Sequence, residues 1–337
     1  MRSFVAFFVL VGSCNGGIRV QELLESAQAA LKAGTADADV ASAVSQATFS
    51  EKLDLAVVEE LESRGAGPET VEALEKLRWV SSKLLPATGI ALFEAPAVPG
   101  VAERDEVIAV ARMEALRYTT GLPDFICTQS VSRFEDAKFT QNWKPLDTLK
   151  VATAYNGKAE KYKLLEIKGK TTSKDFRKVG GFRSSGEFGG TLRAIFAEKS
   201  KTEFRWDRWS RLRGRVAYVF SYRVAKADST YSVGYSTFTT RGNSVTGMVG
   251  SVWIDRETKR VLRLTSEAEE LPAEWPIRAT PSMMDYDWAD VGGVAYLLPR
   301  RVDSRVIRVQ NQRRNVTEFS EYKKFSAKAT VSFEAAP

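Results

Sequence analysis

The apolar residues in the first part of the chain recur at helical spacing. Between Ile18 and Leu85 they return every three or four positions, as in Val20, Leu23 and Ala27, and this period is typical of amphipathic helices. Glycines interrupt the pattern at the expected turns. The pattern therefore predicts four short helices that form a small bundle over residues 18–85.

After one further predicted helix over residues 103–120, the pattern changes to a period of two, which is typical of β-strands with one apolar face. The clearest apolar face consists of Val216, Tyr218, Phe220 and Tyr222. About ten strands are expected after residue 124, together with a short helix at 189–197. We expect a large antiparallel sheet, curved or nearly closed and covered on one face.

Two apolar runs, Val252–Ile254 and Val261–Leu264, form the expected centre of this sheet. The polar segment between them has the length that joins antiparallel strands, so the pattern predicts a hairpin. A second turn is expected at Gly292-Gly293, where positive φ costs little. The strands around that turn are expected at residues 282–288, 294–298 and 301–309.

Proline and glycine are frequent between Pro86 and Gly100, which is typical of a linker. The charge also changes there: residues 18–100 hold 7 Lys/Arg and 13 Asp/Glu, net −6, whereas residues 101–337 hold 41 and 29, net +12. The sequence thus predicts a leader over 1–17, a helical domain over 18–85, a linker over 86–100 and a β domain over 101–337.

The predicted leader is typical of an exported protein. It has one early arginine, an apolar core from Phe4 to Val11 and a small-residue exit, as in a secretory signal peptide. The exit contains Cys14 in a sequence similar to a bacterial lipobox, so three outcomes stay open: lipidation of Cys14, ordinary cleavage, or a buried hydrophobic start to the folded chain. The expected location is the periplasm or, with a lipid anchor, the cell envelope.

The sequence contains no histidine, which excludes Ser-His-Asp and Cys-His catalysis and histidine-ligated zinc. Asp285 and Asp287 lie on a predicted strand and Asp290 follows it, without the glycine spacing of a calcium loop. Cys127 is interpreted as a buried strand thiol. We therefore expect no enzyme, cofactor or metal; an enzyme would have to use Asp285, Glu187 or Cys127.

Two basic stretches are candidates for contact with an anionic surface. In the first, arginines alternate with Trp206 and Trp209, and in the second they alternate with valines and Ile307. An anionic lipid headgroup or a protein partner would suit these stretches, nucleic acid is not expected for an exported protein, and a solvated strand face is the simpler alternative. The candidate patch residues are Arg205, Arg208, Arg211, Arg305 and Arg308.

Three groups of residues carry a resemblance to a known family. They are Ala115–Tyr118 leading into Leu122–Gln129, Gly250–Asp255 followed by Arg260–Arg263, and Met284–Tyr286 with Tyr296–Pro299. They resemble the first helix and strand, the central hairpin and the following strands of the LolA-like family of lipoprotein carriers and lipid-binding proteins. The resemblance covers the C-terminal two-thirds of the chain and implies a curved antiparallel half-barrel with a helical lid. Together with the small N-terminal helical bundle that the apolar pattern predicts, the expected fold class is α+β.

A hydrophobic cavity between sheet and lid is what this resemblance implies. An acyl chain in such a cavity gains roughly 0.8 kcal/mol for each buried methylene. We predict an exported, non-catalytic protein that binds a lipid or another amphiphile, and the alternative is an envelope protein-interaction or stress-sensing module with no lipid cargo. The candidate cavity wall, whose alternative role is ordinary core packing, consists of Val216, Tyr218, Phe220, Tyr222, Leu149, Val151, Tyr155, Val252 and Ile254.

Overall fold

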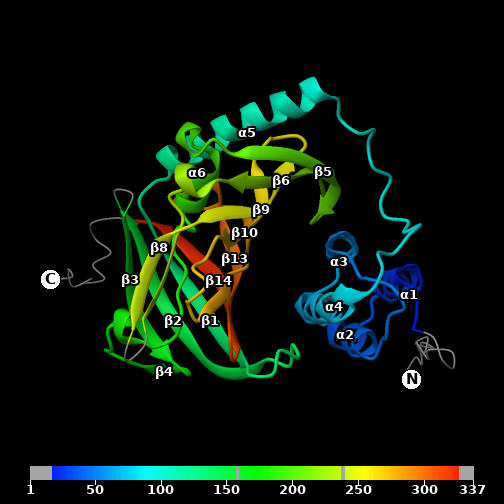
Figure 1. Ribbon diagram of the computed structural model, residues 1–337, viewed down its shortest axis with the longest axis horizontal. Coiled ribbons are helices and arrows are strands. Elements are labelled where there is room, and N and C mark those ends of the chain that lie inside the picture. The colour runs from blue at the N-terminus through cyan, green and yellow to red at the C-terminus, as the bar shows by residue number, and fades with distance from the viewer. Residues whose placement is uncertain (1–16, 157–158, 237–239, 326–337) are drawn as a thin grey trace. The chain divides into compact units, whose positions relative to one another are not determined.

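The computed structural model describes residues 17–156, 159–236 and 240–325 (Figure 1). The chain divides into two compact units. One contains the described residues up to Val98 together with Arg208–Tyr218, and the other contains Pro99–Asp207 and the chain from Val219 onward. The predicted leader and its Cys14 lie outside the described residues, and the predicted domain boundaries stay a prediction.

Four helices form the first unit, as the apolar pattern predicts. Buried Leu23, Val40, Leu61 and Leu74 represent its core, one from each helix. Asp37 fastens the second helix to the fourth, because its carboxylate accepts hydrogen bonds from the backbone N–H groups of Glu69 and Thr70 at 2.8 and 3.2 Å. The helices are α1 (Val20–Lys32), α2 (Asp37–Ser45), α3 (Leu55–Ser63) and α4 (Pro68–Val80).

A large antiparallel sheet dominates the chain after residue 124. Its strand order is β4-β3-β2-β1-β14-β13-β12-β10-β9-β6-β5, with β11 paired to β13, and β7 and β8 form a separate hairpin. The strands are β1 (Phe125–Asp136), β2 (Lys144–Asn156), β3 (Ala159–Ile167), β4 (Lys170–Thr171), β5 (Glu203–Leu212), β6 (Arg215–Val224), β7 (Ser232–Ser236), β8 (Arg241–Val245), β9 (Gly247–Asp255), β10 (Val261–Glu269), β11 (Ile277–Ala279), β12 (Ser282–Asp290), β13 (Ala295–Arg308) and β14 (Gln312–Lys324).

The predicted α+β class and curved antiparallel sheet are confirmed, and the twelve-stranded sheet is open instead of closed. The central hairpin is also confirmed, since Val261 pairs with Ile254 and Leu264 with Val252. The expectation of separate strands at 294–298 and 301–309 is wrong. β13 continues through Pro299, which lies opposite Tyr286 beside a bulge at Arg300, and a bulge is one of the places where a strand tolerates proline.

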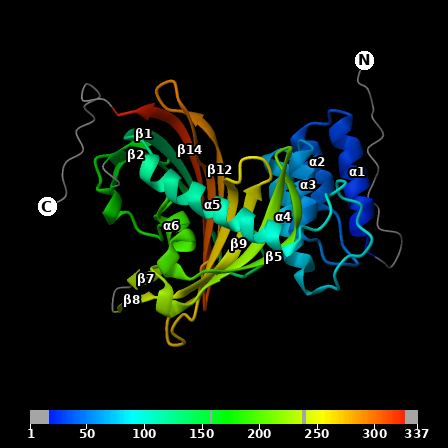
Figure 2. The same ribbon diagram turned by 90° about the horizontal axis from the view of Figure 1, so that it is seen from above.

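Two helices accompany the sheet in the second unit. They are α5 (Val101–Gly121) and α6 (Gly190–Phe196), and Figure 2 shows α5 running obliquely to the strands. Tyr118 of α5 meets Tyr286 of β12 edge to face, with ring centroids 6.2 Å apart. Gly189 begins α6 at φ 104°, and a Cβ there would lie 2.8 Å from the Thr119 side chain. A glycine is therefore required where α6 approaches α5.

Aromatic side chains fill the sheet interior near β1. Phe125 stacks on Tyr155 of β2 with ring centroids 5.2 Å apart. Phe188 meets Phe125 edge to face, with ring centroids 5.1 Å apart. Such ring pairs stabilise a core beyond the area that they bury. Within the ranges that the structure describes, no helix combines the length and the apolar character needed to cross a membrane.

Candidate ligand-binding cavity

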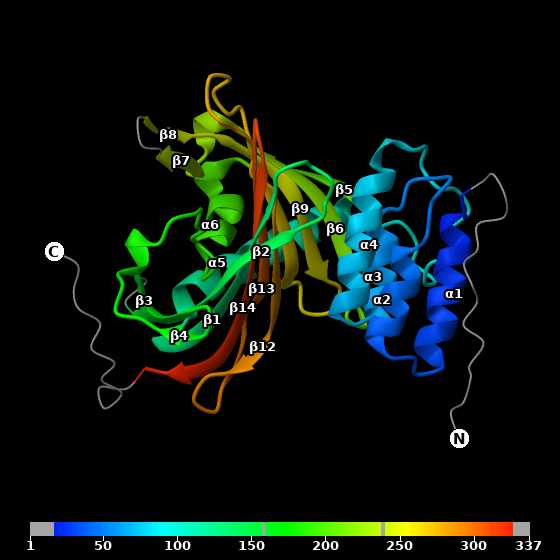
Figure 3. The ribbon, with the colours of Figure 1, turned by 90° about the horizontal axis from the view of Figure 1, so that it is seen from below.

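A cavity of about 800 Å³ lies in the second unit, beside three adjacent strands of the sheet. Its floor consists of residues from β10, β12 and β13, and its walls are the β7–β8 hairpin and the segment Gly181–Thr191. Figure 3 shows the β7–β8 hairpin on the same side of the sheet as α6. Cavities of roughly 300–1,000 Å³ are typical of sites for small molecules.

The floor residues follow from strand alternation. Ser282 and Met284 line the cavity while the intervening Met283 does not, because successive side chains point to opposite faces of a strand. On β13 the lining includes Val302, Ser304 and Val306. Serine hydroxyls thus alternate with apolar side chains on one surface, which suits a molecule with both polar and apolar parts.

The wall segment Gly181–Thr191 contains one buried carboxyl group. Glu187 is 4% exposed, and the Ser184 hydroxyl donates a hydrogen bond to its Oε1 at 2.6 Å. Its Oε2 is buried and has no hydrogen-bond partner among the described residues. Burial, aided by the negative charge of Glu160, raises the pKa of Glu187 to about 7, although the Ser184 bond acts in the opposite direction.

Two smaller pockets lie in the same unit. One of about 40 Å³ shares Phe182, Arg183, Ser184 and Glu187 with the main cavity and reaches Leu149 on β2. The other, of about 210 Å³, lies between α5, α6 and the start of β13, with Tyr118 and Tyr286 in its lining. Glu187 therefore borders both the main cavity and the pocket of about 40 Å³.

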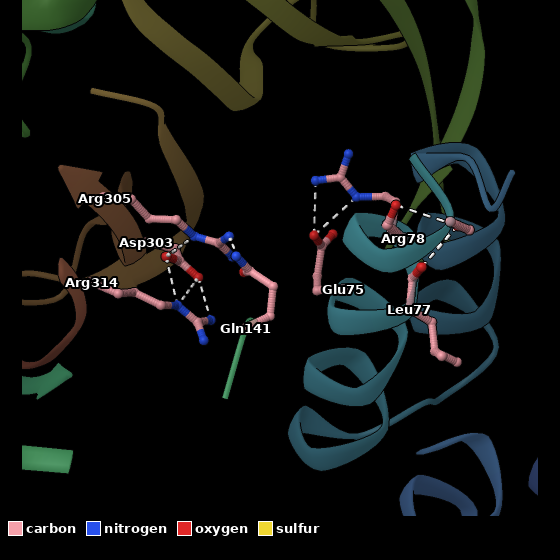
Figure 4. A network of polar contacts seen from close by, with 8 residues as sticks. Glu75, Leu77, Arg78, Gln141, Asp303, Arg305 and Arg314 are labelled. Carbon is pink, nitrogen blue, oxygen red and sulfur yellow. Dashed lines mark hydrogen bonds and ion pairs between the residues drawn. The ribbon is translucent and has the colours of Figure 1, made fainter. Parts of the chain in front are cut away.

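Arginines supply the cations of the main cavity: Arg183, Arg241, Arg305 and Arg308. Arg305 is held by two neighbouring side chains, since its guanidinium donates to Gln141 at 3.1 Å and lies 3.7 Å from Asp303 (Figure 4). Arg314 donates to both oxygens of the same Asp303. These arginines hold the pKa of Asp303 below its ordinary value, although burial acts to raise it.

The predicted wall residues lie elsewhere in the fold. Tyr222 and Val252 are buried, and the Tyr222 hydroxyl donates to the Thr265 carbonyl at 2.8 Å. Of the predicted wall, only Leu149 borders one of the three pockets described above. Buried outside the lining of those pockets are Val151, Tyr155, Tyr218, Phe220, Tyr222, Val252 and Ile254, while Val216 is half-buried. Their role as a ligand wall stays a prediction.

The five arginines of the predicted basic patch lie in three different environments. Within the helical unit, Arg208 lies 2.9 Å from buried Glu59, and Arg211 forms an ion pair with buried Glu60. Arg205 is largely exposed and lies 3.9 Å from Glu203. Arg305 and Arg308 line the cavity, and a role for the five arginines in headgroup binding stays a prediction.

The three side chains that an enzyme would have to use, Asp285, Glu187 and Cys127, are all buried. Cys127 is buried, and burial raises the pKa of its thiol. Asp285 forms a buried ion pair with Arg263 at 2.6 Å, whereas Asp287 is half exposed. The described part of the chain contains no group of three or more Cys, Asp or Glu side chains arranged to hold a metal ion.

The contribution of the β7–β8 hairpin and of the serines on β12 and β13 could not be read from the sequence. Glu187 was identified only as an acid that an enzyme would need. One signal pointed to it: Glu187 is the only acidic residue between Gly180 and Gly190. A charged residue that is isolated among glycines is expected where backbone and ligand approach closely.

Comparison with known proteins finds matches among solved structures alone. No family model and no curated protein matches the chain. Among solved structures, the chain is similar to a DUF1329 family protein from Desulfovibrio piger, with 11% identity, a TM-score of 0.35, and coverage of 68% of this chain and 96% of that one. Similarity at these levels carries no argument about function.

Two further solved structures are similar at the same low level. A putative outer membrane lipoprotein-sorting protein domain from Vibrio parahaemolyticus shares 11% identity with a TM-score of 0.33, over 68% of this chain and 97% of that one. The Pseudomonas aeruginosa MucA/MucB complex gives 11% identity and a TM-score of 0.20, over 63% and 94%.

Proposed function

We propose that this protein is an exported, non-catalytic binding protein of the cell envelope that holds a lipid or another amphiphile. The observation that carries the proposal is the cavity of about 800 Å³ between the β10–β12–β13 floor and the β7–β8 hairpin. A cavity of this size accommodates a drug-sized or single-chain molecule. Export rests on the predicted leader, which lies outside the described residues.

The lining of the cavity favours an amphiphile over a purely polar ligand. Apolar side chains such as Met284, Val302 and Val306 offer a surface for an acyl chain, and each methylene that leaves water contributes roughly 0.8 kcal/mol. Serine hydroxyls and arginines lie on the same lining. A polar head thus finds hydrogen-bond partners while its chain is buried.

Blocking the cavity tests the proposal. Ser282→Trp places a large side chain on the cavity side of β12, and Met283→Trp is the matched control, because Met283 does not line the cavity. We expect Ser282→Trp to weaken binding of a fluorescent fatty acid at least about tenfold, equivalent to about 1.4 kcal/mol, and Met283→Trp to leave it unchanged. Thermal unfolding of both variants checks that each is folded.

Two results would count against the proposal. If the fluorescent fatty acid binds the folded Ser282→Trp variant as tightly as the wild type, the cavity is not its site. If the wild type binds no amphiphile but retains a stable protein partner in a pull-down, the interaction or stress-sensing alternative replaces lipid binding.

A further inference from the structure

Two buried polar atoms on the cavity lining have no hydrogen-bond partner within the described ranges. One is Oε2 of Glu187 and the other is Nε of Arg308. Leaving a buried polar group without a partner costs about 1–3 kcal/mol, so such groups are rare in folded proteins and call for an explanation. Both atoms are explained if a bound molecule supplies the missing partners.

The charges of the lining indicate which kind of head would fit. The lining contains four arginines, and Glu187 is its only acidic residue. Arginine stays protonated in proteins, so Arg308 is a donor that suits an anionic oxygen. A cationic head would meet four like charges, which disfavours it.

The surroundings of Glu187 determine which hydrogen bonds its carboxyl group can make. The titratable and charged groups around it are Arg183 in its own segment, Arg133 on β1, Glu160 and Tyr162 on β3, Tyr286 on β12 and Tyr322 on β14. Burial and the Glu160 charge raise the pKa of Glu187 to about 7. Below that pH its carboxyl group is neutral and has an O–H to donate.

We propose that the cavity selects amphiphiles whose head carries acceptor oxygens, above all anionic ones, with Arg308 and the neutral Glu187 carboxyl group as the two hydrogen-bond donors. This inference rests on the proposed function and names the chemical class of its ligand. Arg308 provides the preference for a negative charge. Glu187 provides a donor at low pH that disappears when the carboxyl group ionises.

The test compares four single-chain probes of equal chain length on the full protein: hexadecanoate, hexadecyl phosphate, methyl hexadecanoate and hexadecylamine. Each displaces a fluorescent fatty acid. We expect the two anionic probes to bind at least about tenfold more tightly than the amine. Hexadecanoate and hexadecyl phosphate distinguish a carboxylate source from a phosphate source of the same chemistry.

Arg308→Gln and Glu187→Gln separate the two donors. Arg308→Gln is expected to weaken the anionic probes about tenfold and methyl hexadecanoate less, because glutamine keeps an N–H donor but has no charge. Methyl hexadecanoate has an acceptor-only head that does not titrate, so its affinity for the wild type should fall about tenfold between about pH 5 and pH 8 as Glu187 ionises. Glu187→Gln keeps a donor at every pH and should remove this dependence.

Two outcomes would overturn the inference: equal or tighter binding of hexadecylamine than of hexadecanoate, or an unchanged pH dependence in Glu187→Gln. Either could occur while methyl hexadecanoate still binds the wild type and is excluded by Ser282→Trp, in which case lipid binding survives and head selection fails. If no probe binds at all, the proposed function itself fails.

Discussion

The strands of the cavity floor and the Gly181–Thr191 wall both contain buried carboxyl groups, but only those on the floor strands are paired with arginines. On the floor strands, Asp285 is paired with Arg263 at 2.6 Å and Asp303 with Arg314. In the wall, Glu187 has a single hydroxyl donor, and its Oε2 has no partner among the described residues. The arginines lower the pKa of Asp303, whereas burial raises that of Glu187.

This difference separates a structural role from a functional one. A buried carboxylate with a bidentate arginine is satisfied by the fold itself and needs no ligand. A buried carboxyl group that lacks a cation destabilises the empty protein at high pH and is retained where a ligand completes it. The comparison therefore assigns stability to the floor and selectivity to the wall.

Removing a floor carboxylate should have the largest effect on stability. Asp285→Ala removes the carboxylate that pairs at 2.6 Å with the Arg263 guanidinium, whose side chain is 4% exposed. We expect the free energy of unfolding to fall by about 3–5 kcal/mol, measured by urea denaturation. If Asp285→Ala does not fold, Asp285→Asn, which keeps the shape of the side chain, serves as the milder variant.

Asp287→Ala is the matched control on the same strand. Asp287 lies 3.9 Å from Arg300, and the two side chains are 49% and 55% exposed. Exposed pairs of this kind contribute little, so the change should stay within about 0.5 kcal/mol. Equal losses from Asp285→Ala and Asp287→Ala would contradict the structural role given to the floor pairs.

Glu187→Gln should change the pH dependence of stability by a smaller amount. Because folding raises the pKa of Glu187 from 4.5 to about 7, the native state binds the proton more tightly, and stability falls as pH rises through this window. Between pH 4.5 and pH 8 the free energy of unfolding of the wild type should fall by up to about 3 kcal/mol because Glu187 ionises. Glu187→Gln should not show that loss.

Urea denaturation at several pH values measures this effect. The ligand-free variant should match the wild type near pH 4.5 and exceed it in stability at pH 8. A variant that is less stable than the wild type at pH 8 would show that ionised Glu187 is stabilised by the fold, which would remove the contrast with Asp303.

The sequence was sufficient to predict most of the fold. Helical spacing located the four N-terminal helices, and the central hairpin pairs as the two apolar runs predicted. The wrong prediction of a strand break at Pro299 has a local cause. A proline within a strand pattern predicts the end of the strand, unless a bulge lies beside it. That bulge depends on the partner strand β12 and is not visible in β13 alone.

The candidate site was less predictable because its residues come from segments distant in the chain. Apolar alternation singled out Tyr218, Phe220 and Tyr222, which are buried in the structure. Core strands and cavity walls have the same pattern, so periodicity does not distinguish them. The cavity floor instead uses serines on β12 and β13, and their position next to the β7–β8 hairpin follows only from the tertiary fold.

Native mass spectrometry of the mildly purified, full-length protein tests the central claim most directly. If the cavity holds an amphiphile, the wild type should carry an added mass that organic extraction removes, and the folded Ser282→Trp variant should lack it. A wild-type protein of unmodified mass that also takes up no added fatty acid would contradict the account.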